Sequence, residues 1–215
     1  MIREMRAAIF DLDGVIVDTA KYHYLAWKRL AKAHGFDFTP VDNERLKGVS
    51  RGQSLAILLE IGGLSVDEAT KSKMAAQKNE WYVDYIRHMD ASELLPGAVE
   101  YLHRIRLKGI KTALGSASKN APLILERLGI AGLFDVIVDG NKVSQAKPDP
   151  EVFLRAAEEL GISPVECVVF EDAEAGIQAA HRAGMGTVGI GSASTLQEAE
   201  VVIPGLAALV ALSGD

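Results

Sequence analysis

Two aspartates one residue apart, Asp11 and Asp13, follow a short apolar run that begins at Ala7. The run predicts a buried strand, and alternation along an extended chain would send both carboxylates to the same side, at the carboxyl edge of a sheet. Two carboxylates about 5 Å apart repel each other by roughly 3 kcal/mol at an effective dielectric constant near 20. The pair therefore needs a bound cation or a shared proton. Other residues of the chain should indicate why the two carboxylates lie together.

Other expected strand ends also carry polar residues. Ser116 follows the second strand, where its hydroxyl and the free amides of the next helix would suit a phosphate. Lys147 lies in a loop stiffened by two prolines, and Glu171 and Asp172 follow the fourth strand. Because the carboxyl ends of parallel strands meet at one edge, we expect all of these side chains to lie together. Hard oxygen ligands with room for water predict Mg²⁺ rather than zinc or copper.

Strand-like and helix-like segments alternate through the second half of the chain. Apolar runs predict strands over 110–115, 134–138, 167–170, 186–190 and 201–203. Helical patterns predict helices over 119–129, 149–161 and 173–184, and an earlier helix with Pro96 in its first turn and Lys108-Gly109 at its end. Long helical segments between strands imply right-handed crossovers. We therefore predict an α/β fold with a doubly wound parallel sheet, a Rossmann-like core.

The stretch from Thr19 to Met89 contains no strand-like pattern. Helical periodicity predicts helices from about Tyr22 to Gly35, around Leu55–Ile61, and from about Ser65 to Met89. We expect residues 19–89 to form an all-helical domain. This domain would be inserted into an α/β core domain made of residues 1–18 and 90–215.

Composition narrows the class of protein. The 215 residues are 48% hydrophobic, which is enough for one sizeable core and a small second domain. With 23 basic and 29 acidic residues the net charge is −6, which argues against nucleic-acid binding. Cys167 is the only cysteine, so no intrachain disulfide is possible, and no signal peptide or membrane span is visible. We expect a cytoplasmic monomer that binds neither nucleic acid nor a membrane.

Taken singly, each of these polar groups has an ordinary structural explanation, such as a helix cap or a surface charge. In this order they resemble the motifs of the haloacid dehalogenase superfamily, which here are Asp11-Leu12-Asp13, Ser116, Lys147 and Glu171-Asp172. The resemblance covers essentially the whole chain, and the helical insert is similar to the cap domain of that superfamily. It implies an enzyme that transfers phosphoryl groups with the help of Mg²⁺.

The resemblance assigns a role to each residue at the sheet edge. Asp11 is implied as the nucleophile that becomes an aspartyl phosphate, and Asp13 as the general acid and base. Ser116 and Lys147 would bind the transferring phosphoryl group. The group implied around Mg²⁺ comprises Asp11, the backbone carbonyl of Asp13, Asp172 and the nearby Glu171.

Finer matches resemble the β-phosphoglucomutase branch of the superfamily. They comprise Asp11–Ala20, Tyr22-His23, Ala26-Trp27, Leu46–Arg51 and Ser116–Asn120. A mutase must bind a second phosphate away from the metal, and the guanidinium group of Arg51 suits that anion. The resemblance further implies that His23 orients Asp13. The residues that it assigns to substrate and phosphate binding are Thr19, His23, Trp27, Lys47, Gly48, Val49, Ser50, Arg51, Ser54, Lys78, Ser116, Ala117, Ser118, Lys119, Asn120 and Lys147.

The implied reaction converts β-glucose 1-phosphate into glucose 6-phosphate. The phosphoryl group passes from Asp11 to the sugar, and the resulting β-glucose 1,6-bisphosphate returns its other phosphate to the enzyme. Closure of the cap would keep water away from the aspartyl phosphate. A sugar-phosphate phosphatase of the same superfamily is the alternative, since it needs the same core. A phosphoacceptor signalling module is disfavoured, because Asp13 and a helical insert follow the acceptor aspartate.

Overall fold

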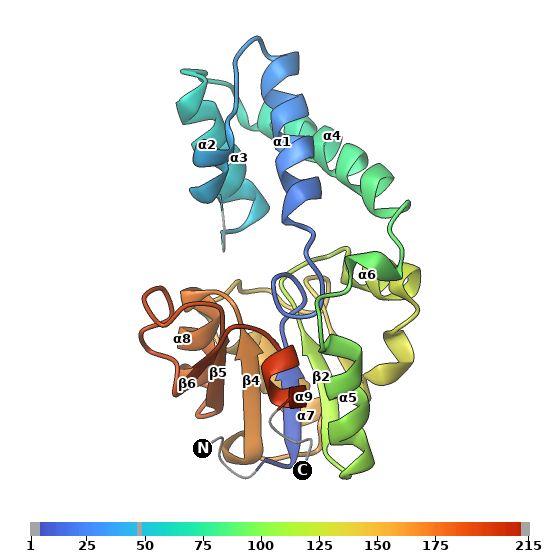
Figure 1. The fold of residues 1–215 in the computed structure, drawn as a ribbon. Coiled ribbons are helices and arrows are strands. Elements are labelled where there is room, and N and C mark those ends of the chain that lie inside the picture. The colour runs from blue at the N-terminus through green and yellow to red at the C-terminus, as the bar shows by residue number, and fades with distance from the viewer. Residues whose placement is uncertain (1–4, 47–48, 212–215) are drawn as a thin grey trace. The chain divides into compact units, whose positions relative to one another are not determined.

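The computed structural model describes residues 5–46 and 49–211 and has two compact units. Unit 1 consists of Met1–Asp18 and Met89–Asp215, and unit 2 consists of Thr19–His88. All strands formed by the described residues belong to unit 1, whereas the described part of unit 2 contains helices and loops (Figure 1). The chain therefore leaves unit 1 after its first strand and returns to complete the sheet.

Within residues 5–46 and 49–211, the sheet of unit 1 contains six parallel strands. They are β1 (Ala7–Phe10), β2 (Lys111–Gly115), β3 (Val136–Val138), β4 (Cys167–Glu171), β5 (Gly186–Ile190) and β6 (Val201–Ile203). Their order across the sheet is β3-β2-β1-β4-β5-β6. β1 lies in the interior of the sheet, and its apolar residues are all buried, as expected for a strand covered on both faces. The predicted doubly wound parallel sheet is confirmed.

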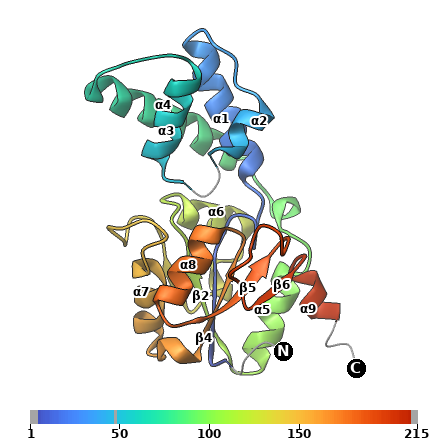
Figure 2. The same cartoon turned by 90° about the vertical axis from the view of Figure 1, so that its left-hand side faces the viewer.

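Helices cover both faces of the sheet (Figure 2). Those of unit 1 are α5 (Ala98–Leu107), α6 (Ala121–Leu128), α7 (Glu151–Leu160), α8 (Glu174–Arg182) and α9 (Ala207–Ala211), with the short 3₁₀ turns η1 (Ala91–Glu93), η2 (Ala131–Leu133) and η3 (Pro164–Glu166). α7 packs on β1, β2 and β3, and α8 packs on β4 and β5, whereas α5 packs on β2 and α9. In Figure 2, α7 and α8 lie on one side of the sheet and α5 and α9 on the other.

Alternating side chains of the central strands build a separate core on each face. Ile9 belongs to a buried cluster with Phe153 of α7 and with alanines of α8. Phe10 takes the opposite face by alternation and stacks on Phe170, with ring centroids 4.6 Å apart. The Tyr101 ring of α5 meets Phe10 edge-on at 6.3 Å. Burial of these large side chains fixes which face of the sheet each helix covers.

Several helix starts differ from the sequence prediction, among them those of α5, α6 and α7, since α7 begins at Glu151 rather than at residue 149. α5 begins at Ala98, so Pro96 lies before the helix rather than in its first turn. The reason is Gly97, whose φ of 81° is left-handed and ends any helical path into Ala98. α6 begins only at Ala121, so the amides that we expected beside Ser116 are not those of a helix start. Serine side chains bind amides of this loop instead.

Unit 2 has four helices among its described residues. They are α1 (Ala20–Ala33), α2 (Pro40–Glu44), α3 (Arg51–Ile61) and α4 (Glu68–Ile86). Side chains cap the starts of α2, α3 and α4, because Thr39 and Ser50 each form a capping box and Asp67 accepts a hydrogen bond from the Thr70 amide. α1 packs along α4, and Trp27 of α1 shares a buried core with residues of α3 and α4.

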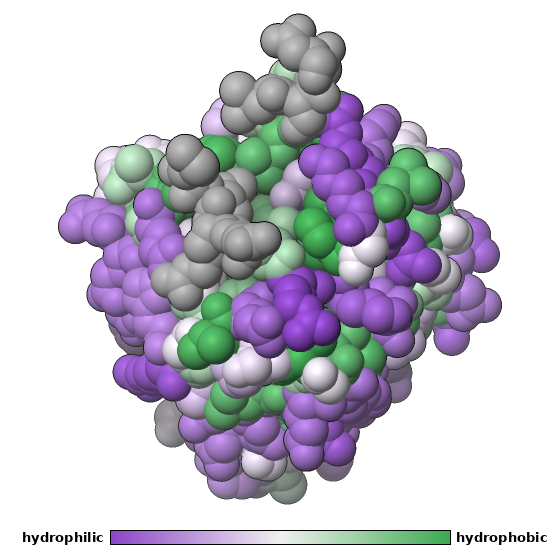
Figure 3. Space-filling view, turned by 90° about the horizontal axis from the view of Figure 1, so that it is seen from below, coloured by the Kyte–Doolittle hydropathy of each residue, from purple (hydrophilic) through white to green (hydrophobic). Residues whose placement is uncertain are grey.

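Hydrophilic and hydrophobic residues are interspersed over the face at which the strands of unit 1 begin (Figure 3). Within residues 5–46 and 49–211, no helix combines the length and the apolar run that crossing a membrane requires. Ligands of open α/β sheets bind at the opposite edge, beyond the carboxyl ends of the strands.

Candidate active site

The carboxyl edge of the sheet carries Asp11, Ser116 and Glu171 on three neighbouring strands. β1 and β4 are in register, and the Asp11 amide continues their ladder by donating to the Phe170 carbonyl over 2.9 Å. Ser116 follows β2 directly, and its amide donates to the Val138 carbonyl of β3 over 3.0 Å. The backbone ladder thus fixes where these functional side chains leave the sheet.

The ammonium group of Lys147 joins two of the carboxylates. Its Nζ donates to Asp11 Oδ1 over 2.6 Å and to Glu171 Oε2 over 2.8 Å. The side chains of Lys147, Asp11 and Glu171 are only 9%, 11% and 2% exposed, so water screens these charges poorly. The same ammonium lies 4.7 Å from the centre of the Phe153 ring, which adds a cation–π contact. These residues form one buried ionic group.

Glu151 holds the loop that carries Lys147. Its carboxylate accepts a hydrogen bond from the Gln145 amide over 2.7 Å and another from the Ser144 amide over 2.9 Å. These bonds lower the pKa of the Glu151 carboxyl group. Glu151 is the first residue of α7, so the helix that packs on the sheet also positions the ammonium group.

Three carboxylates at this edge are close enough to bind one metal ion. Oxygen atoms of Asp11, Glu171 and Asp172 all lie within 4.8 Å of one another. Carboxylate oxygens are hard ligands, and they fit Mg²⁺ better than zinc or copper. The carboxylate of Asp13 is not part of this group. The family resemblance implies the backbone carbonyl of Asp13, rather than its carboxylate, as a ligand.

Crowded negative charge shifts the acid–base properties of the group. Burial raises the pKa of Glu171 to about 8, although Lys147 counteracts it. Burial also raises the pKa of Asp172 to about 7, aided by the charges of Asp11 and Asp13. Burial opposes the charged form of Lys147, but attraction to the carboxylates outweighs it and raises the Lys147 pKa. A divalent cation would relieve the repulsion and keep the carboxylates ionised.

The tight turn after Asp13 brings the backbone against Asp172. Gly14 has a φ of 75°, and its amide donates to the Val17 carbonyl over 2.8 Å. A Cβ atom on Gly14 would lie 2.1 Å from Asp172 Oδ2. Only glycine fits both the left-handed backbone and this contact. The Asp172 carboxylate therefore rests directly on the turn that follows the two aspartates.

The loop after β2 folds around its own serine side chains. Ser116 Oγ accepts from the Ser118 amide over 3.1 Å, and Ser118 Oγ accepts from the Asn120 amide over 3.3 Å. Ser116 is buried, whereas Ala117 and Lys119 are exposed. A hydroxyl that accepts in this way keeps its proton, which Ser116 is able to donate to a phosphoryl oxygen.

In unit 2, Lys78 is buried next to His23. Lys78 Nζ and His23 Nδ1 are 2.8 Å apart, and the ammonium lies 4.6 Å from the Trp27 ring centre and 4.8 Å from that of Tyr82. Burial lowers the pKa of His23 well below its usual value, and the positive charges of Lys78 and Arg51 add to the effect. Because an ammonium only donates, neutral His23 accepts at Nδ1 and carries its proton at Nε2.

Tyr82 is a candidate that the sequence analysis missed. It is fully buried, and its ring stacks on that of His23 with centroids 4.1 Å apart. Its hydroxyl donates to Thr19 Oγ1 over 3.3 Å, which ties α4 to the start of α1. Its position in the sequence, one helical turn after Lys78, could have indicated that the Tyr82 side chain lies on the same face of the helix as Lys78.

The start of α3 carries the residues expected at the second phosphate. Ser50 caps the helix, and Arg51 is its first residue. Arg51 is exposed, and it forms no ion pair with a carboxylate of the described residues. Ser54 is buried. The other expected residues of this loop are Val49, which is exposed, and Lys47 and Gly48, which lie outside the described residues.

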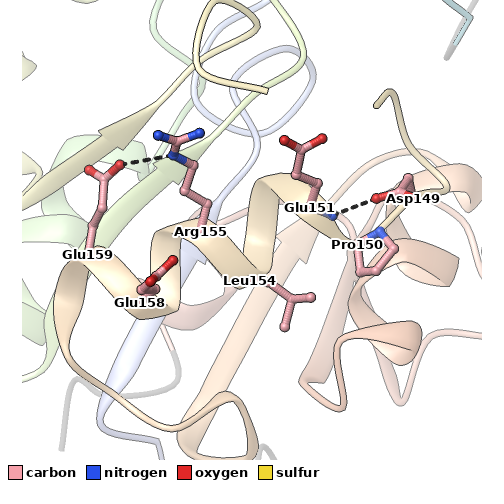
Figure 4. A pocket seen from close by; sticks show the side chains of 7 residues that line it. All are labelled: Asp149, Pro150, Glu151, Leu154, Arg155, Glu158 and Glu159. Atoms are coloured by element: carbon pink, nitrogen blue, oxygen red, sulfur yellow. Dashed lines mark hydrogen bonds and ion pairs between the residues drawn. The ribbon is translucent and has the colours of Figure 1, made fainter. Parts of the chain in front are cut away.

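A hollow along α7, whose lining residues are drawn in Figure 4, is not lined by any member of the acidic group, which comprises Asp11, Glu171 and Asp172. It is lined by Asp149, Pro150, Glu151, Leu154, Arg155, Glu158 and Glu159. Arg155 forms an ion pair with Glu159 over 3.5 Å, and Glu151 is occupied by loop amides. We therefore assign the chemistry to the sheet edge.

Comparisons with known proteins agree with this geometry. The sequence pattern of the haloacid dehalogenase-like hydrolases matches residues 5–184. A β-phosphoglucomutase of Bacillus subtilis (strain 168) is 45% identical over 201 residues, covering 93% of this chain and 89% of that protein. A phosphorylated carbohydrates phosphatase of Thermotoga maritima is 33% identical, over 84% of this chain and 82% of that protein.

Solved structures agree as well. The crystal structure of a β-phosphoglucomutase from Clostridium difficile matches with a TM-score of 0.89 and 44% identity, covering 95% of this chain and 93% of that one. The resemblance inferred from the motifs, including the likeness to β-phosphoglucomutases, is confirmed. With its parallel sheet, its carboxylate group and its helical insert, the chain is an enzyme that belongs to the haloacid dehalogenase-like hydrolase family.

Proposed function

We propose that the protein is a phosphomutase that interconverts β-glucose 1-phosphate and glucose 6-phosphate. The observation that carries the proposal is the group at the sheet edge, where Lys147 contacts Asp11 and Glu171 beside a third carboxylate. Such a group suits the transfer of a phosphoryl group to a carboxylate and back. The 45% identity to the Bacillus subtilis β-phosphoglucomutase supports a sugar phosphate as the substrate.

Asp11 is the proposed nucleophile. In the phosphorylated form of the enzyme, which is ready to react with the sugar phosphate, one carboxylate oxygen of Asp11 carries a phosphoryl group as an aspartyl phosphate. The buried ammonium of Lys147, 2.6 Å from Oδ1, would offset negative charge on the carboxylate and on the phosphoryl oxygens. The hydroxyl of Ser116 would donate to the same oxygens.

Asp13 is the proposed general acid and base. It takes the proton of the sugar 6-hydroxyl as that oxygen attacks the phosphorus atom of the aspartyl phosphate. The bond from phosphorus to Asp11 breaks, which frees the carboxylate and leaves β-glucose 1,6-bisphosphate. The bisphosphate then changes its orientation so that its 1-phosphate faces Asp11. Asp11 attacks this phosphate, and Asp13 returns the proton to the departing 1-oxygen. Glucose 6-phosphate leaves, and the aspartyl phosphate is restored.

Mg²⁺ is the proposed metal ion. The residues proposed to hold it are Asp11, Asp172 and the backbone carbonyl of Asp13, with Glu171 nearby. When bound, it would reduce the repulsion between the attacking carboxylate and the phosphoryl oxygens. Support comes from the spacing of the carboxylate oxygens, all within 4.8 Å of one another, and from the raised pKa values of Glu171 and Asp172.

Unit 2 is proposed to serve as the cap domain. Arg51 would bind the phosphate that is not reacting, because its guanidinium group presents a fork of donors. His23, held neutral beside Lys78, offers an Nε2 donor suited to orienting Asp13. Closure of the cap over the substrate and the roles of the other cap residues stay predictions. The cytoplasmic location, the monomeric state and the absence of nucleic-acid and membrane partners also stay predictions.

A sugar-phosphate phosphatase is the alternative function. It would use the same core, with water in place of the sugar hydroxyl as the group that attacks the aspartyl phosphate. The 33% identity to the Thermotoga maritima phosphorylated carbohydrates phosphatase favours it.

Product analysis separates the two functions. The protein is incubated with Mg²⁺ and β-glucose 1-phosphate, with and without β-glucose 1,6-bisphosphate, and the products are followed by ³¹P NMR. A mutase yields glucose 6-phosphate, faster when the bisphosphate is present, with little inorganic phosphate. Inorganic phosphate as the main product would reject the mutase in favour of the phosphatase, and the absence of both products would reject both.

A further inference from the structure

A glycine of α8, Gly176, lies directly against the acidic group. It is the third residue of the helix. A Cβ atom at this position would lie 2.0 Å from Cδ, 2.2 Å from Oε2 and 2.3 Å from Cγ of Glu171. Real Cβ atoms essentially never come within 3.0 Å of such atoms. The side chain of Glu171 therefore occupies the space that an alanine methyl group would need.

Conformational freedom does not explain this glycine. Gly176 is not among the residues with a positive φ, so its backbone is one that alanine adopts readily. Alanine is also a much better helix former than glycine. A glycine at this position costs helix stability, and the gain that the structure offers in return is room for Glu171.

Glu171 has little freedom to move aside. Its side chain is 2% exposed, and both carboxylate oxygens are engaged. Oε2 accepts from Lys147 over 2.8 Å, and Oε1 accepts from the Ala173 amide over 3.3 Å. Because Cγ and Cδ both lie in the space of the missing methyl group, an alanine would displace the whole carboxylate rather than rotate its end.

We propose that Gly176 is a positioning residue, which seats the Glu171 carboxylate against Lys147 and thereby sets the arrangement of the carboxylates that bind the metal. The seating of Glu171 does not depend on which reaction the enzyme performs. The effect that this placement of Glu171 has on catalytic turnover rests on the proposed function. Gly14 contacts Asp172 in a similar way, but its positive φ makes any substitution there strained, so Gly176 provides the cleaner test.

The test is a double-mutant cycle between Gly176→Ala and Glu171→Ala, with binding of Mg²⁺ alone measured by calorimetry. We expect Gly176→Ala to weaken Mg²⁺ binding about 10- to 100-fold, which is the range observed when a residue that orients the metal ligands is lost. In the Glu171→Ala background the same change should alter the affinity less than about twofold, because no side chain remains to be displaced. Gly132→Ala is the matched control, since its Cβ would meet no atom within 4 Å, and it should leave the affinity unchanged.

Unchanged Mg²⁺ affinity in Gly176→Ala, or equal losses in both backgrounds, would overturn the proposal. If Gly176→Ala does not fold, recovery of folding in the double variant supports the seating role, and failure of the double variant to fold overturns it.

A crystal structure of Gly176→Ala gives a readout that needs neither metal nor substrate. We expect the distance between Lys147 Nζ and Glu171 Oε2 to exceed 2.8 Å clearly, and an unchanged distance would contradict the proposal. If the wild-type protein turned over no sugar phosphate at all, the proposed function would fail. This distance would still decide the role of Gly176.

Discussion

The ammonium group of Lys147 donates to Asp11 over 2.6 Å, although 136 positions separate the two residues in the chain. The bond links the end of β1 to the loop before α7. It sets a buried positive charge on the carboxylate that we propose as the nucleophile. A chain with a net charge of −6 thus provides local positive charge where the proposed anionic substrate would bind.

Replacement of Lys147 by methionine tests the role of this charge. We expect Lys147→Met to lower the turnover number about 10²- to 10³-fold, the usual effect of removing one donor to charge that develops in a transition state. The matched control is Lys142→Met, because Lys142 pairs with Glu159 at the surface over 2.9 Å. Steady-state kinetics with saturating Mg²⁺ measures both variants. A loss of less than about twofold in Lys147→Met would remove this residue from phosphoryl transfer.

Binding of Mg²⁺ should depend on pH. Because the pKa of Asp172 is raised to about 7 and that of Glu171 to about 8, protons compete with the metal near neutrality. We expect affinity to be full above these pKa values and to be lost as the pH falls from 8 to 6, by about tenfold per pH unit for each proton displaced. Calorimetry with Mg²⁺ alone measures this change. Affinity that stays constant over this range would mean that the carboxylates do not hold the ion.

Substitution of Arg51 separates mutase chemistry from hydrolysis. A lost charged hydrogen bond costs about 1.5–3 kcal/mol, so Arg51→Ala should lower kcat/KM for sugar-phosphate isomerisation roughly 10- to 100-fold. Hydrolysis of a small aryl phosphate, which has no second phosphate, should change little. Arg45→Ala is the control from the same unit, since Arg45 pairs with Glu60 over 3.0 Å at the surface. Equal losses for both substrates in Arg51→Ala would show that Arg51 does not bind the distal phosphate.

The environment of His23 gives a prediction that needs no substrate. Lys78→Met removes a positive charge 2.8 Å from His23 Nδ1, so the pKa of His23 should rise toward its usual value. It should stay below that value, because burial is the larger cause of the shift. NMR titration of the His23 ring measures the pKa, and Lys73→Met on the same helix serves as the control. An unchanged pKa in Lys78→Met would show that His23 does not depend on this ammonium.

Much of the fold was predictable because its signals are local. Buried parallel strands appear as short apolar runs, and the last two strands have the predicted bounds, Gly186–Ile190 and Val201–Ile203. The polar residues at the strand ends were also predictable, because each follows directly after a short apolar run. The start of α5 was misplaced, because Pro96 suits a first helical turn equally well, and only the backbone of Gly97 decides where the helix begins.

Contacts between distant residues could not be predicted. A glycine in a sequence shows that a side chain is missing, but not that a carboxylate from another segment fills its place, as Glu171 does at Gly176. The bond between Tyr82 and Thr19 spans 63 positions and joins two helices. Such relationships depend on how elements pack, which periodicity and motif spacing do not encode.

Covalent phosphorylation of Asp11 is the step on which the proposed mechanism depends most. The direct measurement is protein-bound label after the enzyme is mixed with Mg²⁺ and ³²P-labelled β-glucose 1,6-bisphosphate and quenched in acid. We expect acid-stable label on the wild-type protein that maps to Asp11, and neither label nor turnover in Asp11→Asn. Label that maps to another residue, or normal turnover in Asp11→Asn, would contradict the mechanism.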